Sequence, residues 1–555
     1  MHHVLLLCLG LTMAVCLLVM LSERLRLPYP ILLVVGGLTI SFIPGLPPLK
    51  VEPDLIFLIF LPPLLYEAAW FTSWQEFWRW RRLIGFLAFG LVLLTSGVVA
   101  LVAWSVIPGF TLALGFLLGG VVSPPDAVAA TSVMRTMKLP RRITAILEGE
   151  SLVNDASSLI VFRFALAAVL SGVFSWQQAA TSFLLVTLLG IAVGLGVALL
   201  FYALHRWLPT SPSAHTVLTL ITPHLLYVAA ETLHVSGVMA VVSGGLLLSY
   251  HSSHLFSPGN RRQGLSTWAS LGFILNGAVF VLIGLQLPVI VNELGAFSKL
   301  EAMGYGVLVT AVLVLTRIAF LLLASPFSHF MSRFIAVSDA NPGWRGPLIV
   351  GYAGMRGVVS LAAALSIPLL TPGGQPFPQR NLILFITFVV ILLTLVGQGL
   401  TLPLLIRWIG VEDRDAARPE HEQQMALRQH LAQTSLGYLQ RHYRREKQHN
   451  SLVNSLGRKL EKEVQLTSQR LALLTDNRVE AEVAQYHHIF SDLLRAQRLE
   501  LHKLRRLGHY DAEVIRYLEG QLDLEEEKLF HLAYYAPSHQ LAVPSRANVT
   551  PKNSH

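Results

Sequence analysis

The scarcity of charge over the first 410 residues limits how this chain can fold more than any other feature. Only 34 of these residues are Asp, Glu, Lys or Arg, and apolar residues make up 53% of the whole chain. Apolar windows of about 20 residues are long enough to cross a bilayer as helices, which satisfy their own backbone hydrogen bonds in lipid. The sequence therefore predicts an all-α polytopic membrane protein.

The apolar windows divide this part into thirteen candidate transmembrane helices. The division of 213–251 into two of them rests on the short break ETLHVSG. The predicted ranges are 3–22, 28–45, 54–72, 83–107, 111–134, 143–171, 177–206, 213–232, 234–251, 265–291, 301–325, 346–370 and 379–408. The first range is interpreted as a retained helix and not as a cleaved signal peptide, because further spans follow it.

The basic residues of the loops indicate an orientation. With the N-terminus outside, the loops assigned to the cytoplasm carry fourteen Lys and Arg residues, whereas the opposite loops carry Lys50, Lys299 and Arg380. Cytoplasmic loops are enriched in Lys and Arg, and thirteen spans place the C-terminus in the cytoplasm. The net charge of +9 belongs to this membrane part and not to a nucleic-acid surface, since residues 411–555 hold 21 basic and 20 acidic residues.

The composition changes after residue 410. Charged residues occupy 41 of the last 145 positions, and no proline lies between Pro419 and Pro537. Leucines at helical spacing among the charges predict a cytoplasmic, regulatory bundle of about four helices over 411–536. Glycines are expected near the helix ends, at Gly437, Gly457, Gly508 and Gly520. Residues 537–555 are expected to be disordered.

The fifth predicted helix contains the sequence SPPD. Pro124 and Pro125 remove backbone donors and break a helix in the middle of the membrane. Asp126 then stands at the start of a second half-helix, where free N–H groups favour an anion. The unwound carbonyls of 122–124 are left to coordinate a cation. Irregular backbone at this depth is tolerated where protein or a water-filled cavity satisfies it.

The sixth helix carries the sequence EGESLVND. Glu150 lies four residues before Asn154, and Ser151 lies four residues before Asp155, so the two pairs form neighbouring stripes. Charged groups at membrane depth are costly and mark an ion pathway or a pair. We expect Asp155 and Ser151 to face a cavity, and Glu150 to pair with Arg356 of the twelfth helix.

Glycines at 351, 354 and 357 interrupt the twelfth helix. If the seventh helix is a linker, six helices precede it and six follow, so the fifth and twelfth correspond. Broken helices in matching halves are the sequence signature of an inverted-repeat transporter with a site at the midplane. Glu67 is a candidate further ligand, and Arg317 is expected to hold two helices together.

An oxygen-rich cluster without soft ligands suits a hard cation and not a transition metal. A carboxylate that binds either a proton or Na+ makes the two compete, and this competition is exchange. The spans contain no HExxH or GxSxG sequence, and Cys8 and Cys16 have no plausible partner, so an enzyme is not expected. No cofactor is expected beyond the transported ions.

Five blocks of the chain carry a resemblance. SPPDAVA, GESLVNDASSL, HVSGVMAVVSGG, NGAVFVLIGLQLP and GYAGMRGVVSLAAALSIP follow one another in this order within about residues 10–410. Together they resemble the monovalent cation:proton antiporter-1 family, which includes bacterial NhaP-type and animal NHE-type exchangers. One departure is Pro125, since many relatives have a threonine immediately before the aspartate of the broken helix.

This resemblance implies two inverted six-helix repeats, a homodimer in the bacterial inner membrane and an elevator-like motion. It implies that Asp155 is the exchanging carboxylate with Asn154 as its partner, and that Ser151 and Glu67 help to coordinate Na+. It also implies that Asp126 acts through backbone or water. Electroneutral one-for-one exchange of Na+ or Li+ for H+ is the leading interpretation. K+/H+ exchange and a membrane-anchored regulatory protein are the alternatives, and the partner of the tail is left open.

Overall fold

The structure is a computed structural model of the chain. It describes residues 2–25, 27–43, 56–134, 137, 139–172, 176–208, 211–292, 294, 297–331, 343–411, 420–473, 477–507 and 510–534. The chain divides into two compact units, Met1–Asp413 and Arg414–His555. Among the described residues the regular structure is helical, apart from one isolated bridge between Leu370 and Pro376.

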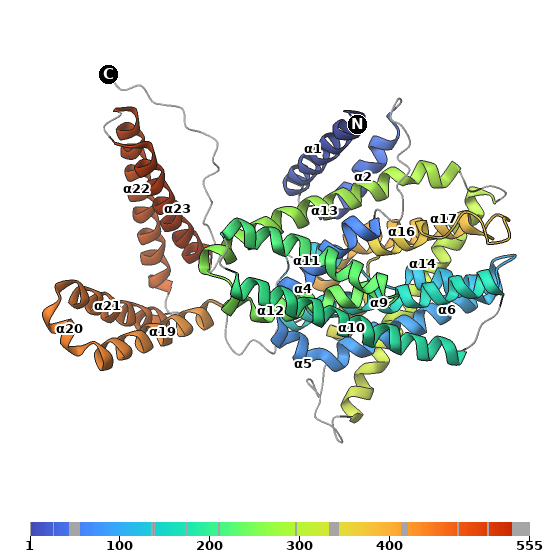
Figure 1. Cartoon of the computed structure of the whole chain (residues 1–555), viewed down its shortest axis with the longest axis horizontal. Coiled ribbons are helices and arrows are strands. Elements are labelled where there is room, and N and C mark those ends of the chain that lie inside the picture. The colour runs from blue at the N-terminus through green and yellow to red at the C-terminus, as the bar shows by residue number, and fades with distance from the viewer. Residues whose placement is uncertain are drawn as a thin grey trace. The chain divides into compact units, whose positions relative to one another are not determined.

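The first unit begins with six helical segments (Figure 1), three of which change helix type or break along their length. They are α1 (His2–Leu25), α2 (Tyr29–Ser41), the π-turn η1 (Ile56–Phe60) with α4 (Leu61–Phe71), α5 (Trp74–Gly85) with η2 (Phe86–Leu91) and α6 (Val92–Val106), the pair α7 (Leu112–Val122) and α8 (Ala127–Met134), and α9 (Arg141–Ser171).

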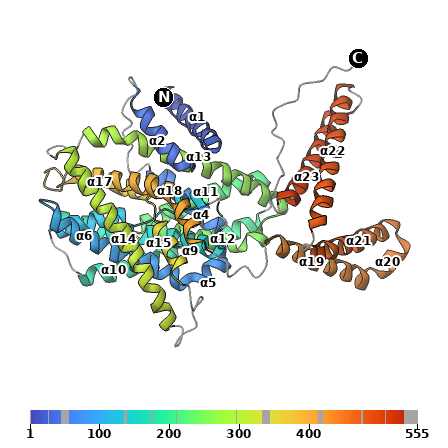
Figure 2. The same cartoon turned by 180° about the vertical axis from the view of Figure 1, so that it is seen from behind.

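A single long helix, α10 (Trp176–Trp207), separates these segments from six more. The later segments, seen from behind in Figure 2, include the second broken pair. They are α11 (Pro212–Thr232), α12 (Gly237–Leu255), α13 (Pro258–Asn292), α14 (Lys299–Met331), the pair α15 (Arg345–Tyr352) and α16 (Val358–Leu365), and α17 (Arg380–Leu392) with η3 (Leu393–Gln398) and α18 (Gly399–Ile409).

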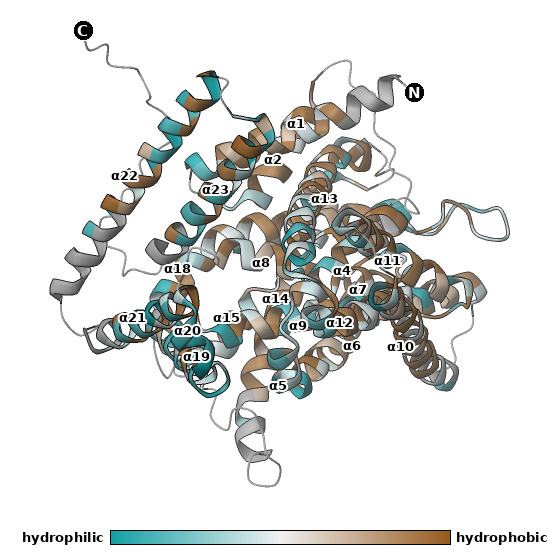
Figure 3. Cartoon of the chain, turned by 60° about the vertical axis from the view of Figure 1, so that its left-hand side comes forward, coloured by the Kyte–Doolittle hydropathy of each residue, from teal (hydrophilic) through white to brown (hydrophobic). Residues whose placement is uncertain are grey.

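Each of the thirteen predicted ranges coincides with one of these helices or helix pairs in the described part of the chain. The division of 213–251 is correct, because His234 has a positive φ of 57° and separates α11 from α12. By length and composition, seven described helices can cross a membrane, and two shorter apolar ones lie at Tyr29–Ser41 and Leu58–Phe71. In Figure 3 apolar residues dominate helices such as α10, whereas α19 is largely hydrophilic.

Small residues allow close approaches that hold the broken helix in place. A side chain at Gly115 would meet the backbone of Ala100, and one at Gly119 would meet that of Ser96, so α7 lies against α6 with little space between them. Small residues let helix backbones approach closely in membranes, where packing drives association. The first half of the broken helix is therefore fixed by its neighbour.

The described residues of the second unit form four long helices and one short one. They are α19 (Glu420–His442), α20 (Arg444–His449), α21 (Ser451–Leu473), α22 (Asn477–Leu507) and α23 (Ala512–Tyr534). Helix α19 packs on α21, and α22 packs on α23. Arg498 donates to Asp523 at 2.6 Å and to Glu526 at 2.9 Å, and these hydrogen bonds, that to Asp523 foremost, raise the pKa of the Arg498 guanidinium.

The prediction that glycines lie near the ends of the tail helices is wrong at Gly520. Gly520 lies in the interior of α23, whereas Gly437 and Gly457 each lie within two turns of an end of α19 and α21. An exposed helix tolerates a glycine in its interior at a cost of about 1 kcal/mol, so a glycine by itself does not fix a boundary. Gly508 and the predicted disordered segment 537–555 lie outside the described residues.

Candidate functional site

The first broken helix ends at Val122 and resumes at Ala127, as the two consecutive prolines predict. The Asp126 carboxylate accepts a hydrogen bond at 2.8 Å from the N–H group of Val128, at the start of α8. This is the geometry of a helix N-cap, in which an oxygen satisfies a free donor of the first turn. Asp126 is thereby held at the exact point where the backbone is interrupted in the middle of the segment.

The second broken helix meets the first at this point. The N–H group of Asp126 donates to the carbonyl of Met355, in the break between α15 and α16, at 2.6 Å. A side chain at Gly357 would collide with the Asp126 carboxylate, so the glycine leaves room for that carboxylate. The two interruptions, which are more than 200 residues apart in the sequence, are joined by a backbone hydrogen bond.

Helix α9 places its polar residues beside the first break. Ser151 Oγ accepts from the N–H group of Ala127 at 3.2 Å, and Asn154 Nδ2 donates to the carbonyl of Pro125 at 3.2 Å. Asn154 Oδ1 is buried and has no hydrogen-bond partner among the described residues. Asp155 follows Asn154 on α9 and is 7% exposed. The structure thus brings Ser151 and Asn154 of α9 to the break that Asp126 borders.

Arg356 takes up the carbonyl groups at the end of α7. Its Nε donates to the carbonyl of Val122 at 2.9 Å and its Nη2 to that of Ser123 at 3.3 Å, and Nη1 donates to the carbonyl of Gly354. The last carbonyls of a helix lack partners and carry its negative dipole end, so a buried guanidinium is a favourable cap. Of the carbonyls of 122–124 that the sequence predicts as cation ligands, those of Val122 and Ser123 accept hydrogen bonds from Arg356 in this structure.

Glu150 pairs with Arg317 and not with Arg356, so the predicted ion pair is corrected. Arg317, on α14, donates to the two carboxylate oxygens of Glu150 at 2.5 and 2.7 Å, and both side chains are almost completely buried. Its Nε also donates to the carbonyl of Val350 at 3.3 Å. A bidentate arginine fork satisfies a buried carboxylate well. Arg317 connects α9, α14 and α15, consistent with its predicted role between helices.

Glu67 lies on α4 and is not brought into contact with this cluster. Its carboxylate lies against Gly272 of α13, where an added side chain would overlap it. Within the described residues, no hydrogen bond or ion pair joins Glu67 to Asp155 or Ser151. In this structure the set of oxygen ligands close to the breaks therefore comes from α9 and from the segment 123–126.

Sequence reasoning missed the residues that support Arg356. The N–H group of Arg356 donates to Thr394 Oγ1 at 3.1 Å, from the π-turn η3, and the Ser123 and Ser96 hydroxyls lie 2.8 Å apart. π-turns within α-helices are frequent at functional sites, but they leave no reliable sequence pattern. A single hydroxyl in an apolar run gives no sign of its partner.

A substitution at Gly357 tests whether the close approach between this glycine and the Asp126 carboxylate matters. Replacing Gly357 with Ala should slow ion exchange by about tenfold or more, roughly 1.4 kcal/mol in the barrier, because the new methyl group displaces the Asp126 carboxylate. Exchange in vesicles and the thermal unfolding midpoint in detergent measure the two effects separately. Gly373, where an added side chain meets open space, is the matched control. Unchanged exchange in the Gly357→Ala protein would show that the close approach is unimportant.

The sequence matches known transport proteins over most of its length. A family profile described as "Sodium/hydrogen exchanger, transmembrane" matches residues 10–408. The sodium, potassium, lithium and rubidium/H(+) antiporter of Bacillus subtilis (strain 168) is 37% identical over 392 residues, which are 68% of this chain and 58% of that protein. The chain therefore spans less than two thirds of the length of this relative.

Other relatives match along almost the whole chain. The uncharacterized Na(+)/H(+) exchanger YjcE of Escherichia coli (strain K12) is 32% identical over 524 residues, which are 91% of this chain and 94% of that protein. Among solved structures, the sodium proton antiporter MjNhaP1 of Methanocaldococcus jannaschii at pH 8 matches with a TM-score of 0.58 and 18% identity, covering 73% of this chain and 100% of that one. At this identity the match supports the fold alone.

Proposed function

Because the chain belongs to the sodium/hydrogen exchanger family, which consists of transporters and not enzymes, we propose that it exchanges a monovalent cation for a proton across a membrane. One observation carries this proposal. A nearly buried Asp155 directly follows Asn154, whose side chain reaches the first break beside Asp126 and keeps a buried oxygen without a partner among the described residues, where two broken helices meet. These oxygens are hard donors and suit an alkali cation.

Exchange follows from competition at Asp155. A bare carboxylate at this depth is costly, so Asp155 is stable when it holds either a proton or a cation. Asn154 offers a neutral oxygen to the cation and adds no second titrating group. Ser151, Asp126 and, after a movement of α4, Glu67 would complete the coordination. If access alternates only when Asp155 is occupied, proton flow in one direction drives cation flow in the other.

The architecture suits alternating access. Two buried arginines are satisfied near the point where α7/α8 meets α15/α16. Arg356 caps the end of α7, and Arg317 pairs with Glu150. A site balanced in this way can move as one body, as an elevator-like mechanism requires. We propose that the protein is a homodimer in a bacterial inner membrane. Its N-terminus would lie outside and its C-terminus in the cytoplasm, because the basic residues of the loops favour that orientation.

Sodium is our first choice of cation, with lithium, and potassium is the alternative. The name of the Bacillus subtilis relative includes sodium, potassium, lithium and rubidium, and that of the Escherichia coli relative includes sodium. Both names contain a proton as the second ion. The oxygen donors around Asp155 suit a hard cation and do not select among these ions.

The stoichiometry gives a direct test of the function. We expect purified protein in vesicles to move protons when Na+ or Li+ is added, at a rate insensitive to membrane potential, because one carboxylate exchanges one charge for one. A pH-sensitive dye reports the proton, and K+ with valinomycin sets the potential. Response to K+ alone would favour the alternative. Absence of any cation-dependent proton movement, or strong acceleration by voltage, would contradict the proposal.

We also propose that the helices of the second unit regulate the exchanger from the cytoplasm. Eleven of the twenty histidines lie beyond residue 410, and histidine is the residue type most often used to sense physiological pH. The same vesicle assay with a protein truncated after residue 419 tests the idea. An unchanged dependence of the rate on pH would dispose of a pH-sensing role.

A further inference from the structure

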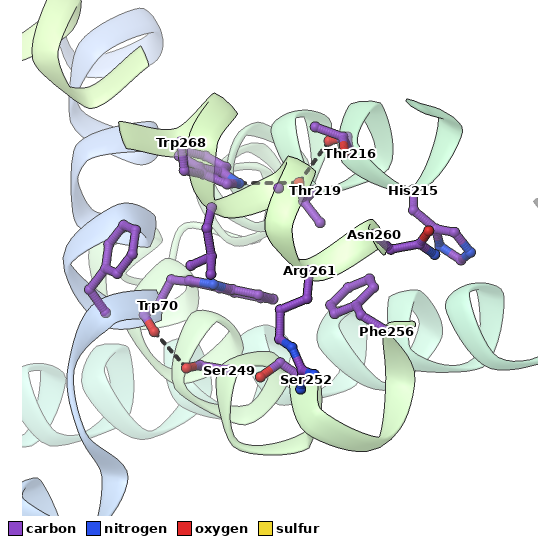
Figure 4. Close-up of a pocket in the computed structure, with 13 residues that line it drawn as sticks. Trp70, His215, Thr216, Thr219, Ser249, Ser252, Phe256, Asn260, Arg261 and Trp268 are labelled. Carbon is purple, nitrogen blue, oxygen red and sulfur yellow. Dashed lines mark hydrogen bonds between the residues drawn. The ribbon is translucent and has the colours of Figure 1, made fainter. Parts of the chain in front are cut away.

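A cavity of about 200 Å³ lies in the first unit, outside the cluster around Asp155. Its walls come from the end of α4, the start of α11, the end of α12 and the start of α13. Figure 4 shows Arg261 extending into the space near Trp70, Ser252 and Phe256. None of the ion-site residues described above lines this cavity.

Three of the four hydroxyl groups that line the cavity, those of Thr216, Thr219 and Ser249, are already used as donors. Thr219 Oγ1 donates to the carbonyl of Thr216 at 2.7 Å, and Ser249 Oγ donates to that of Trp70 at 2.6 Å. The indole N–H of Trp268 donates to Thr219 Oγ1 at 3.1 Å. These hydrogen bonds hold the walls of the cavity in place. A ligand must therefore be bound by donors of other side chains.

The donors that remain point to an anion. In the described part of the chain, no hydrogen bond or ion pair engages the guanidinium of Arg261, the side-chain amide of Asn260 or the hydroxyl of Ser252. No Asp or Glu is among the described residues that line the cavity. Arginine carries five donors in a planar fork that matches phosphate oxygens, and its charge is permanent. A cation would find one positive charge here and no carboxylate.

The aromatic walls of the cavity favour a ligand that has an apolar part as well as a charged group. The rings of Trp70 and Phe256 lie 5.9 Å apart, and Trp268 is buried beside Tyr66 with their rings 5.2 Å apart. Aromatic residues of this kind gather at the level of lipid headgroups, where one part of a molecule is apolar and the other polar. The cavity therefore combines one cationic anchor with apolar walls.

We propose that this cavity binds the phosphate group of an anionic amphiphile, with Arg261 as the charged anchor and Asn260 and Ser252 as further donors. The apolar part of the ligand, such as an acyl chain, lies along Trp70 and Trp268. The proposal does not rest on the exchange activity. Its chemistry is that of a phosphate ester, whether from a membrane phospholipid or from a small phosphorylated molecule.

Occupancy of the cavity would act on the helices around Glu67. Trp70 follows Glu67 by one turn of α4, and Trp268 precedes Gly272, which the Glu67 carboxylate touches, by one turn of α13. A ligand bound between these two tryptophans fixes α4 against α13. We therefore expect binding to raise the thermal unfolding midpoint of the whole chain.

Ligand binding to the full chain in detergent tests the proposal. The probes are dihexanoyl phosphatidylglycerol, glycerol 3-phosphate, inorganic phosphate and dihexanoylglycerol, which lacks phosphate. We expect saturable binding of the phosphatidylglycerol, weaker binding of the two small phosphates and none of dihexanoylglycerol. Equal affinity for inorganic phosphate and the lipid would overturn the part of the proposal that assigns the aromatic walls to the ligand.

Three variants separate specific binding from general attraction. Arg261→Gln should raise the dissociation constant by about tenfold or more, since a charge-assisted hydrogen bond is lost. Arg262→Gln removes the same charge from the next residue, which does not line the cavity, and should leave the affinity unchanged. Ser252→Phe fills the cavity, keeps Arg261 and should also abolish binding.

Ligand-free unfolding midpoints establish that each variant is folded before its affinity is compared. Undiminished affinity in Arg261→Gln, an equal loss in Arg262→Gln, or full binding by Ser252→Phe would each refute the site. Failure of every phosphate probe to bind the wild type would refute it as well. Exchange activity enters none of these measurements, so an error in the proposed function leaves this test intact.

Discussion

Replacing Asp155 with Asn will reduce cation-dependent proton movement to the level of protein-free vesicles. Asn has nearly the same shape as Asp, so the packing of α9 is retained, but its amide accepts no proton and carries no charge to balance a cation. Burial makes the loss complete, because almost no water reaches this position to act in its place. Dye-reported proton movement with Na+, Li+ and K+ measures the effect.

Glu148 is the matched control for this variant. It lies on the same helix two turns earlier, and the structure leaves it partly exposed. Glu148→Gln should therefore exchange ions at close to the wild-type rate. An Asp155→Asn protein that is folded, as judged by its unfolding midpoint, and still exchanges at the wild-type rate would remove the basis of the proposed mechanism. Equal losses in the two variants would mean that the assay reports helix charge in general.

The arrangement of helices in the first unit could be predicted because its causes are local. Apolar length, paired prolines and clustered glycines act within a few residues, so each predicted range coincides with a helix and both interruptions lie where expected. The glycines of the tail mark helix ends less well, since Gly520 lies at an exposed position in the interior of α23, and Gly457 is buried in α21, where an added side chain would meet Lys447. A glycine is decisive only where the backbone or a close neighbour requires it, as at Gly357.

The partners of the two buried arginines could not be predicted, because pairing is a tertiary property. Both Arg317 and Arg356 are single cations in apolar helices, and helical spacing places Glu150 within reach of a cation without naming it. The structure distinguishes them by geometry. Arg317 faces the carboxylate with its full fork, whereas the carbonyls at the end of α7 occupy Arg356. The sequence predicts that the broken helix leaves carbonyl groups without backbone partners. It does not predict that Arg356, from a distant segment, donates to them.

The buried Glu150–Arg317 pair should contribute strongly to stability when one partner is removed. Glu150→Gln leaves a guanidinium without its counter-charge in the protein interior, and Arg317→Met leaves a carboxylate in the same position. Each change is expected to destabilise the folded state by about 3–5 kcal/mol, because an unpaired buried charge is the dominant cost. The unfolding midpoint in detergent should fall clearly for both single variants.

The double variant and an exposed pair separate this effect from simple loss of packing. Glu150→Gln with Arg317→Met should recover most of the stability, since no isolated charge remains; a loss equal to the sum of the single changes would show that the two residues are not coupled. Arg163 and Glu231 form a pair at 2.8 Å whose side chains are 51% and 31% exposed. This pair is far less buried than Glu150–Arg317, so Glu231→Gln should destabilise the protein clearly less than Glu150→Gln does.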